Sequence, residues 1–185
     1  FSKAYFLYLK EIFDKVSLLE IKSFIEVLLA ARESGSTIFF IGNGGSAATA
    51  SHFANDLAFG TNEYEKPFKV MSIVDNITVL TALGNDYGYD SIFVRQLKVY
   101  GKKQDVLVGI SASGNSKNII NAFEYASTIG IKTVALTAFD GGKLRKITDY
   151  SVHIPTGDKE YGPAEDLHMI LDHLVGNYLM RLVKE

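Results

Sequence analysis

Short apolar runs alternate with helical stretches along most of the chain, and this alternation limits the possible folds more than any other feature. The runs are rich in β-branched residues and lack an apolar–polar alternation, as expected of strands buried on both faces of a parallel sheet. They occupy residues 37–41, 69–74, 105–110, 133–137 and, more weakly, 150–154. The helical stretches between them are 46–59, 76–83, 91–100, 117–128 and 142–147. The pattern predicts an α/β fold, a three-layer doubly wound sandwich around a mainly parallel five-stranded sheet.

Two N-terminal helices and one C-terminal helix flank this core. Apolar residues recur at spacings of three and four from Tyr5 to Leu29, which predicts two helices before the first strand. Pro163 suits the first turn of a closing helix. We therefore expect a single domain over residues 1–185, made of an N-terminal helical extension and an α/β core that includes the closing helix. The extension covers residues 1–35 and the core residues 36–185.

The apolar faces of the first two helices also need a partner. The spacing from Leu9 to Leu19 is typical of helices that pack in an oligomer. The alternative is that these faces only cover the sheet of the same chain. The sequence predicts a homo-oligomer, with a tetramer as the preferred state.

Charge and cysteine content restrict the partners and the compartment. The 185 residues carry a net charge of −2 with both signs interspersed, which argues against nucleic-acid binding. No stretch has the length of a membrane span, so we expect no membrane partner. The chain has no cysteine and so needs no oxidising compartment. We expect a cytoplasmic protein that binds a small molecule.

The first glycine turn, GNGGSA at residues 42–47, follows a predicted strand and precedes a predicted helix. It matches G-x-G-x-x-A, the fingerprint of dinucleotide-binding folds. That fingerprint also needs an acid at the end of the next strand, about 20 residues on. Glu63 and Glu65 have this spacing but lie in a polar turn, and Asp75 lies some thirty residues on. We therefore expect no nucleotide cofactor, and a purely structural glycine turn stays an alternative.

The second turn, SASGNS at residues 111–116, predicts a phosphate site. It brings three hydroxyls and a run of backbone N–H groups to the start of a helix, where the helix dipole favours an anion. No P-loop lysine is present, so nucleoside triphosphate hydrolysis is not supported. The alternative is that Ser113 and Ser116 serve only as a turn residue and a helix cap. Because both turns join a strand to a helix, a doubly wound sheet would place them around one ligand.

Five motifs together resemble a known family. They are the GNGGSA turn, the His-Phe-Ala that follows it, GNDYGYD at residues 84–90, the SASGNS turn and a late E-x-x-H-x-x-x-x-H. As a set they resemble the SIS (sugar isomerase) domain, and more narrowly the phosphoheptose isomerases. Members of that group interconvert sedoheptulose 7-phosphate and D-glycero-D-manno-heptose 7-phosphate. The resemblance covers nearly the whole chain.

The resemblance implies a fold, an activity and a place in metabolism. It implies a ketose–aldose isomerase that works through an enediol, assembles as a tetramer with sites between subunits, and supplies heptose for bacterial lipopolysaccharide or capsule. It also implies a zinc ion. Two alternatives stay open, a non-catalytic SIS adaptor and a regulator that binds a phosphosugar.

The resemblance also assigns roles to residues of this chain. It implies Asp56 as catalytic base, His173 as catalytic acid and a metal site at His52, Asp56, Glu165 and His173. The family has Glu where this chain has Asp56, and usually Gln where this chain has Glu165. An Asp side chain is shorter by one methylene, about 1.5 Å. The implied substrate contacts are Asn43, Gly44, Gly45, Asn85, Asp86, Ser111, Ala112, Ser113, Ser116 and Glu165.

Helix geometry bears on the implied metal site. His52 and Asp56 are four residues apart and so share one helical face, where an imidazole and a carboxylate suit a zinc-type ion. Glu165 and His173 are eight residues apart, about 12 Å along a straight helix. One ion could contact both only if the helix bends or different subunits contribute. Packing roles for both histidines are the alternative.

Overall fold

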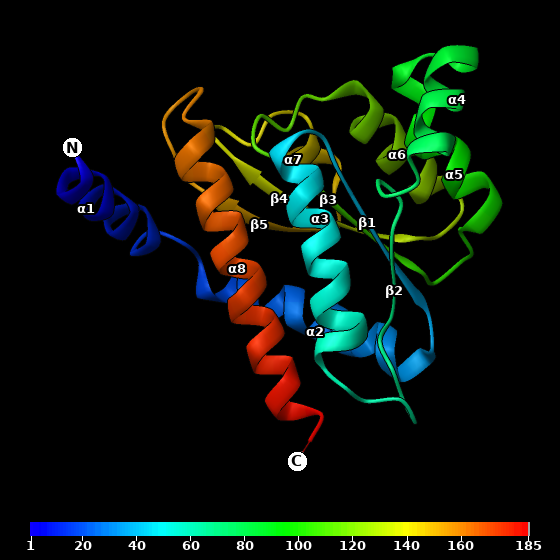
Figure 1. Cartoon of the computed structure of the whole chain (residues 1–185), viewed down its shortest axis with the longest axis horizontal. Coiled ribbons are helices and arrows are strands. Elements are labelled where there is room, and N and C mark those ends of the chain that lie inside the picture. Colours follow the sequence, from blue (N-terminus) through cyan, green and yellow to red (C-terminus); the bar gives the residue numbers. More distant parts are fainter. Residues whose placement is uncertain (185) are drawn as a thin grey trace.

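The computed structural model describes residues 1–184 and has the expected α/β architecture, with helices on both faces of a wholly parallel five-stranded sheet (Figure 1). The C-terminal Glu185, which the expected core includes, lies outside the described residues. The strand order is β2-β1-β3-β4-β5. The strands are β1 (Thr37–Gly42), β2 (Lys69–Ser72), β3 (Val106–Ser111), β4 (Lys132–Ala138) and β5 (Tyr150–Ile154).

Alternate residues of each central strand enter different layers of the core. Ile38 and Phe40 of β1 pack on one face, and Phe39 and Ile41 on the other. The first face is covered by α2 (Leu18–Ser34), α3 (Gly45–Asn55) and α8 (Tyr161–Leu182). The second is covered by α5 (Ile92–Tyr100), α6 (Lys117–Thr128) and α7 (Leu144–Ile147), and α4 (Ile77–Tyr87) packs beside them through the partly buried Leu80 and Leu83. No helix within residues 1–184 combines the length and the apolar character needed to cross a membrane.

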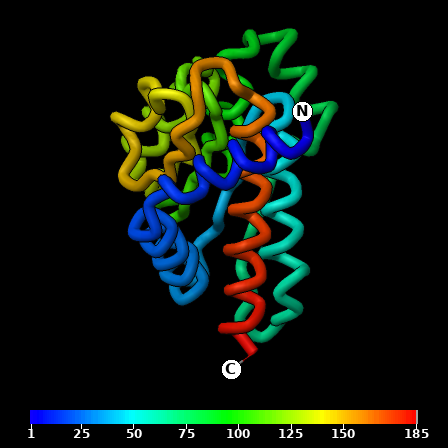
Figure 2. The backbone as a smooth tube through the Cα atoms, turned by 90° about the vertical axis from the view of Figure 1, so that its left-hand side faces the viewer, coloured from blue at the N-terminus to red at the C-terminus, as the bar shows by residue number. Residues whose placement is uncertain are grey.

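The two N-terminal helices behave differently. Phe24 and Leu28 of α2 are fully buried in the core beneath the sheet. Helix α1 (Ser2–Phe13) lies across the amino-terminal part of α8 and projects from the body of the molecule (Figures 1 and 2). It buries Ile12, while Phe6 and Leu7 are exposed. Helix α2 thus packs in the core against the sheet. The exposed apolar side chains named here, Phe6 and Leu7, lie on α1.

Several helix boundaries differ from the sequence prediction, including α7, which begins at Leu144 rather than at residue 142. The helix expected at 46–59 ends at Asn55 and continues as a π-helical turn, η1 (Asp56–Gly60). The helix expected at 76–83 extends to Tyr87 and stops at Gly88, whose φ of 83° other residues rarely adopt. The closing helix begins at Tyr161, before Pro163, because proline is tolerated throughout the first helical turn. A short 3₁₀ turn, η2 (Tyr89–Ser91), joins α4 to α5.

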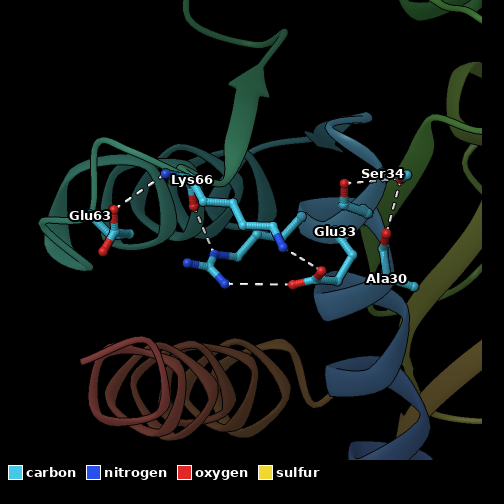
Figure 3. Close-up of polar contacts among 7 residues, drawn as sticks. Ala30, Glu33, Ser34, Glu63 and Lys66 are labelled. Atoms are coloured by element: carbon cyan, nitrogen blue, oxygen red, sulfur yellow. Dashed lines mark hydrogen bonds and ion pairs between the residues drawn. The ribbon is translucent and has the colours of Figure 1, made fainter. Parts of the chain in front are cut away.

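Polar contacts hold the loop between η1 and β2 against α2 (Figure 3). The side chain of Lys66 forms an ion pair with Glu33, and the backbone carbonyl of Lys66 accepts a hydrogen bond of 2.8 Å from Nε of Arg32. Glu63 accepts a backbone hydrogen bond from Lys66 at 3.3 Å. These contacts tie the loop that leads into the edge strand β2 to helix α2.

His168 of α8 links that helix to the sheet and makes the stability of the fold sensitive to pH. Its ring is fully buried, and Nε2 lies 3.4 Å from the carbonyl oxygen of Thr137 in β4. Nδ1 has no hydrogen-bond partner among residues 1–184. Burial lowers the pKa of His168 to about 4, from an ordinary value of 6.5. The folded chain therefore holds this ring neutral under conditions in which the unfolded chain would protonate it.

We predict that the free energy of unfolding has a contribution from His168 that is complete above pH 6.5 and is lost as the pH falls toward 4. The lost contribution is roughly 3 kcal/mol, since one pKa unit corresponds to about 1.36 kcal/mol. Urea unfolding of the wild type and of His168→Leu at pH 7.5, 6.5 and 5.5 measures it. The difference between the two proteins should change with pH, because other titrating groups are common to both. Parallel pH profiles would contradict the prediction.

Candidate functional site

The two turns singled out in the sequence meet at the carboxyl edge of the sheet. In the order β2-β1-β3-β4-β5 the direction of winding reverses between β1 and β3, and ligands of such sheets bind outside the strand ends at that point. A cavity of about 120 Å³ lies there. Its lining residues are Asn43, Ser46, Ile110, Ser111, Ala112, Ser113, Ser116, Ile119, Tyr161 and Glu165. The expectation that both turns face one ligand site is consistent with this cavity.

A pair of amides joins the two turns. Asn43 and Asn118 exchange side-chain hydrogen bonds of 3.0 and 2.9 Å, and the hydroxyl of Tyr89 donates to the Asn43 amide oxygen at 2.8 Å. Asn43 was expected from the sequence, whereas Asn118 and Tyr89 were not. Asn118 is a buried polar residue next to Ile119 in α6, and a polar residue within an apolar helix face is the signal that would have found it. Its amide fixes the orientation of Asn43 at the cavity.

The second turn is shaped by close backbone packing. Gly114 has φ of 61°, and a Cβ there would lie 2.0 Å from the carbonyl oxygen of Gly141. Ser111 accepts a hydrogen bond of 3.2 Å from the Gly114 N–H, so its hydroxyl helps to form the turn. Ser116 is the N-cap of α6 and makes no side-chain capping bond in the described structure. Ser113 accepts a hydrogen bond of 3.3 Å from the Asn115 N–H, so its hydroxyl also takes part in the turn. Ser113 and Ser116 both line the cavity, and the Ser116 hydroxyl is the one at the helix start that makes no turn or capping bond in the described structure.

Glu165 reaches the cavity because the facing residue has no side chain. A Cβ on Gly45, the first residue of α3, would lie 2.3 Å from a carboxylate oxygen of Glu165. The carboxylate thus occupies the amino end of α3, where unpaired N–H groups and the helix dipole stabilise negative charge. Gly44, the N-cap of α3, is exposed at the same turn. Glu165 belongs to the cavity rather than to the histidine cluster described next.

A cluster of two histidines and two carboxylates lies farther along the same helices. His52, Asp56, Asp172 and His173 each offer a ligand atom, and these atoms all lie within 4.8 Å of one another. Nε2 of His52 is 3.4 Å from Nε2 of His173 and 3.6 Å from Oδ2 of Asp56. Asp56 opens the π-helical turn η1, a distortion that is frequent at functional sites. The donor atoms of this cluster suit a transition-metal ion, and the cluster could hold one.

Asp172 is the member of the cluster that the sequence analysis missed. It is completely buried, and neither carboxylate oxygen has a hydrogen-bond partner within the described chain. Burial, together with the nearby charge of Asp56, raises the pKa of Asp172 to about 7. The signal was present in the sequence, because Asp172 lies between Leu171 and Val175 in the apolar stripe of α8. An acid in such a stripe must be buried.

The structure separates some residues that the resemblance grouped. Glu165 is not part of the four-residue cluster, and it precedes His173 by eight residues in the continuous helix α8, about 12 Å. Asn85 and Asp86 are exposed on α4 and hydrogen bond to each other at 2.8 Å. Neither lines the cavity of this chain.

Comparison with known proteins shows what the whole chain resembles. Residues 4–138 match the model of the SIS domain. A phosphoheptose isomerase of Helicobacter pylori (strain P12) is 37% identical over 161 residues, which cover 87% of this chain and 83% of that protein. The phosphoheptose isomerase of Clostridium acetobutylicum is 37% identical over 156 residues, covering 84% of this chain and 79% of that protein.

Solved structures of phosphoheptose isomerases also resemble this chain. A phosphoheptose isomerase from Neisseria gonorrhoeae superposes with a TM-score of 0.84 at 31% identity, covering 94% of this chain and 91% of that one. One from Francisella tularensis superposes with a TM-score of 0.87 at 26% identity, covering 97% and 96%. The likeness spans the helices and the sheet alike.

We predict that the two glycines at the turns differ in their tolerance of a side chain. Both Gly44 and Gly114 have positive φ, 54° and 61°, so Gly44→Ala and Gly114→Ala should each lose about 1–3 kcal/mol of unfolding free energy. Gly44 has open space around it, whereas Gly114 faces the Gly141 carbonyl. Gly114→Ala should therefore lose a further 1–3 kcal/mol or so from overpacking. Chemical denaturation measures both, and equal losses would contradict the role assigned to the close backbone contact.

Proposed function

Because the chain belongs to the SIS-domain family of phosphoheptose isomerases, we propose that it interconverts sedoheptulose 7-phosphate and D-glycero-D-manno-heptose 7-phosphate through an enediol. The product would supply heptose for a bacterial lipopolysaccharide or capsule. The observation that carries the proposal is the pairing of an acid–base cluster, Asp56 with His173, and an anion-binding turn on the same helical framework.

The phosphate would bind at the SASGNS turn. The hydroxyls of Ser113 and Ser116 and the backbone N–H groups at the start of α6 are neutral donors directed toward the cavity end. The residues that line the cavity, as far as the chain is described, include no basic side chain. Neutral donors and the helix dipole would therefore hold the phosphate without a counter-charge.

The sugar would extend from this turn toward the histidine cluster. Asn43 and Glu165 line the cavity and can bond to sugar hydroxyls, with Gly44, Gly45 and Ala112 shaping the backbone around them. Glu165 and His173 are about 12 Å apart along α8. An extended seven-carbon sugar phosphate, with bonds of about 1.5 Å, has a comparable length of roughly 10 Å. This match supports a long open-chain substrate.

Asp56 and His173 would carry the proton transfers. The carboxylate of Asp56 takes a proton from C1 of the ketose while His173 gives a proton to the C2 oxygen, which yields the enediol. Asp56 then returns its proton to C2, and the proton of the C1 hydroxyl passes back to His173, leaving the aldose. The acid and the base lie within 4.8 Å of each other, close enough to act on adjacent carbons.

The residues present fit a zinc ion at the cluster. Imidazole nitrogens and carboxylate oxygens are zinc ligands, and the oxygens of buried Asp172 have no hydrogen-bond partner among the described residues. We propose that His52, Asp56 and His173 would hold the ion. If Glu165 is also a ligand, it must come from another subunit. Bound zinc would supply Lewis acidity toward the oxygens of the substrate.

We further propose that the enzyme is a homotetramer. Helix α4 buries no residue within the described chain, although Ile77 and Tyr87 on it are large and apolar. A neighbouring subunit that covers α4 would bring Asn85 and Asp86 to a site between subunits. Light scattering coupled to gel filtration tests this at micromolar concentration. A tetramer mass is expected, a dimer would correct only the number of subunits, and a monomer would contradict the proposal.

The reaction itself is tested by exchange of the C1 proton of sedoheptulose 7-phosphate with D₂O, followed by NMR. Exchange reports enediol formation even where net conversion is slow. Wild type should exchange this proton, and Asp56→Asn and His173→Gln should each exchange it about 10² to 10⁴-fold more slowly, because a general acid or base contributes that much.

Ser113→Ala is the matched control, since it removes a phosphate contact and leaves the acid–base pair in place. It should weaken substrate binding about tenfold or more, the usual cost of one charge-assisted hydrogen bond, with exchange at saturation close to wild type. If wild type binds ketose phosphates and exchanges no proton on any of them, the chain is instead a non-catalytic adaptor or a phosphosugar-binding regulator.

A further inference from the structure

We propose that Asp172 is the fourth ligand of a metal site that a single chain completes, with His52, Asp56 and His173 as the other three. The family resemblance assigns Asp172 no role and places Glu165 in the metal site instead. The inference rests on the metal-binding part of the proposed function and does not depend on the reaction.

The environment of Asp172 is the first reason. Its side chain is 0% exposed on the inner face of α8, yet both oxygens lack a hydrogen-bond partner within residues 1–184. A buried carboxylate without a partner is strongly unfavourable in a packed interior, and buried charges are normally paired or coordinated to a metal. The oxygens are directed at the histidine cluster, since Oδ2 lies 3.9 Å from Nε2 of His52. A cation at the cluster would satisfy them.

The spacing of the donor atoms is the second reason. Ligands bound to zinc at about 2.0–2.1 Å in a tetrahedron lie about 3.4 Å from one another. Nε2 of His52 lies 3.4, 3.6 and 3.9 Å from the nearest donor atoms of His173, Asp56 and Asp172. The remaining pairs are within 4.8 Å. Small side-chain movements would bring all four to bonding distance of one ion.

Charge and helix geometry select this set over one with Glu165. Two carboxylates and two neutral imidazoles carry a formal charge of −2, which a divalent ion neutralises. Helices α3 and α8 run side by side in the same direction (Figures 1 and 2), and Glu165 faces Gly45 at their amino ends. His52 and Asp172 lie about two turns farther along. Within one chain, Glu165 and the cluster therefore lie about two helical turns apart along α3 and α8.

The test measures zinc binding to the full chain after chelator treatment, with no substrate present. Equilibrium dialysis and competition with a chromophoric chelator give stoichiometry and affinity. Wild type should bind about one zinc ion per chain, and Asp172→Asn should bind it at least 10 to 100-fold more weakly. Glu165→Gln and the control Asp166→Asn, an exposed acid of the same helix, should stay within twofold of wild type.

Thermal unfolding with and without zinc provides a readout that does not depend on activity. An ion that binds only the folded state raises the melting temperature, so zinc should raise it for wild type and Glu165→Gln and much less for Asp172→Asn. If Asp172→Asn fails to fold, Asp172→Leu, which suits the apolar stripe, replaces it. The spectrum of Co²⁺-loaded wild type should show the strong absorption of a four-coordinate site.

Three results would overturn the inference: no zinc bound by wild type, equal affinity in wild type and Asp172→Asn, or equal loss in Glu165→Gln and Asp172→Asn. None of these depends on isomerase activity. Failure of proton exchange in a chain that binds zinc through Asp172 would reject the proposed reaction and keep the metal site.

Discussion

The parallel contact of α3 and η1 with α8 sets the geometry of the whole site. Gly45 meets Glu165 at the amino ends, His52 meets His173 farther along, and Gly60 meets Met180 near the carboxyl end. Because both helices start at the carboxyl edge of the sheet and run in the same direction, the helical rise of about 1.5 Å per residue fixes the distance between the cavity and the cluster. The helix pair therefore fixes how far the cluster lies from the cavity, whereas the two turns shape the cavity itself.

The site divides polar groups by charge. The cavity offers hydroxyls, amides and backbone N–H groups with one carboxylate, and the cluster holds two imidazoles and two carboxylates. Neutral donors at a helix start can bind a phosphate reversibly. Groups that transfer protons must instead be able to gain and lose a charge. Helix α8 also brings two titratable groups into the interior, Asp172 at the cluster and His168 against β4.

Several features were predictable because they depend on local chemistry. The five apolar runs became the five strands, and the two glycine–serine turns were placed at one cavity because a doubly wound sheet brings them together. Helix ends were less predictable. Asn85 and Asp86 suggest a loop by composition, yet α4 continues through them to the positive φ of Gly88. The π-helical turn at Asp56 has no sequence signal of its own, since it depends on packing against α8.

The sequence by itself determined the α/β class, the two glycine- and serine-rich turns between strand and helix, and the i, i+4 pairing of His52 with Asp56, because each follows from spacing along the chain. Only the tertiary structure decided which residues of α8 join that pair. Glu165 and His173 lie on one helix but at different levels of the α3–α8 contact, so the fold assigns one to the cavity and the other to the cluster. The same contact buries Asp172 beside His52, because residues 120 positions apart meet only when the two helices pack.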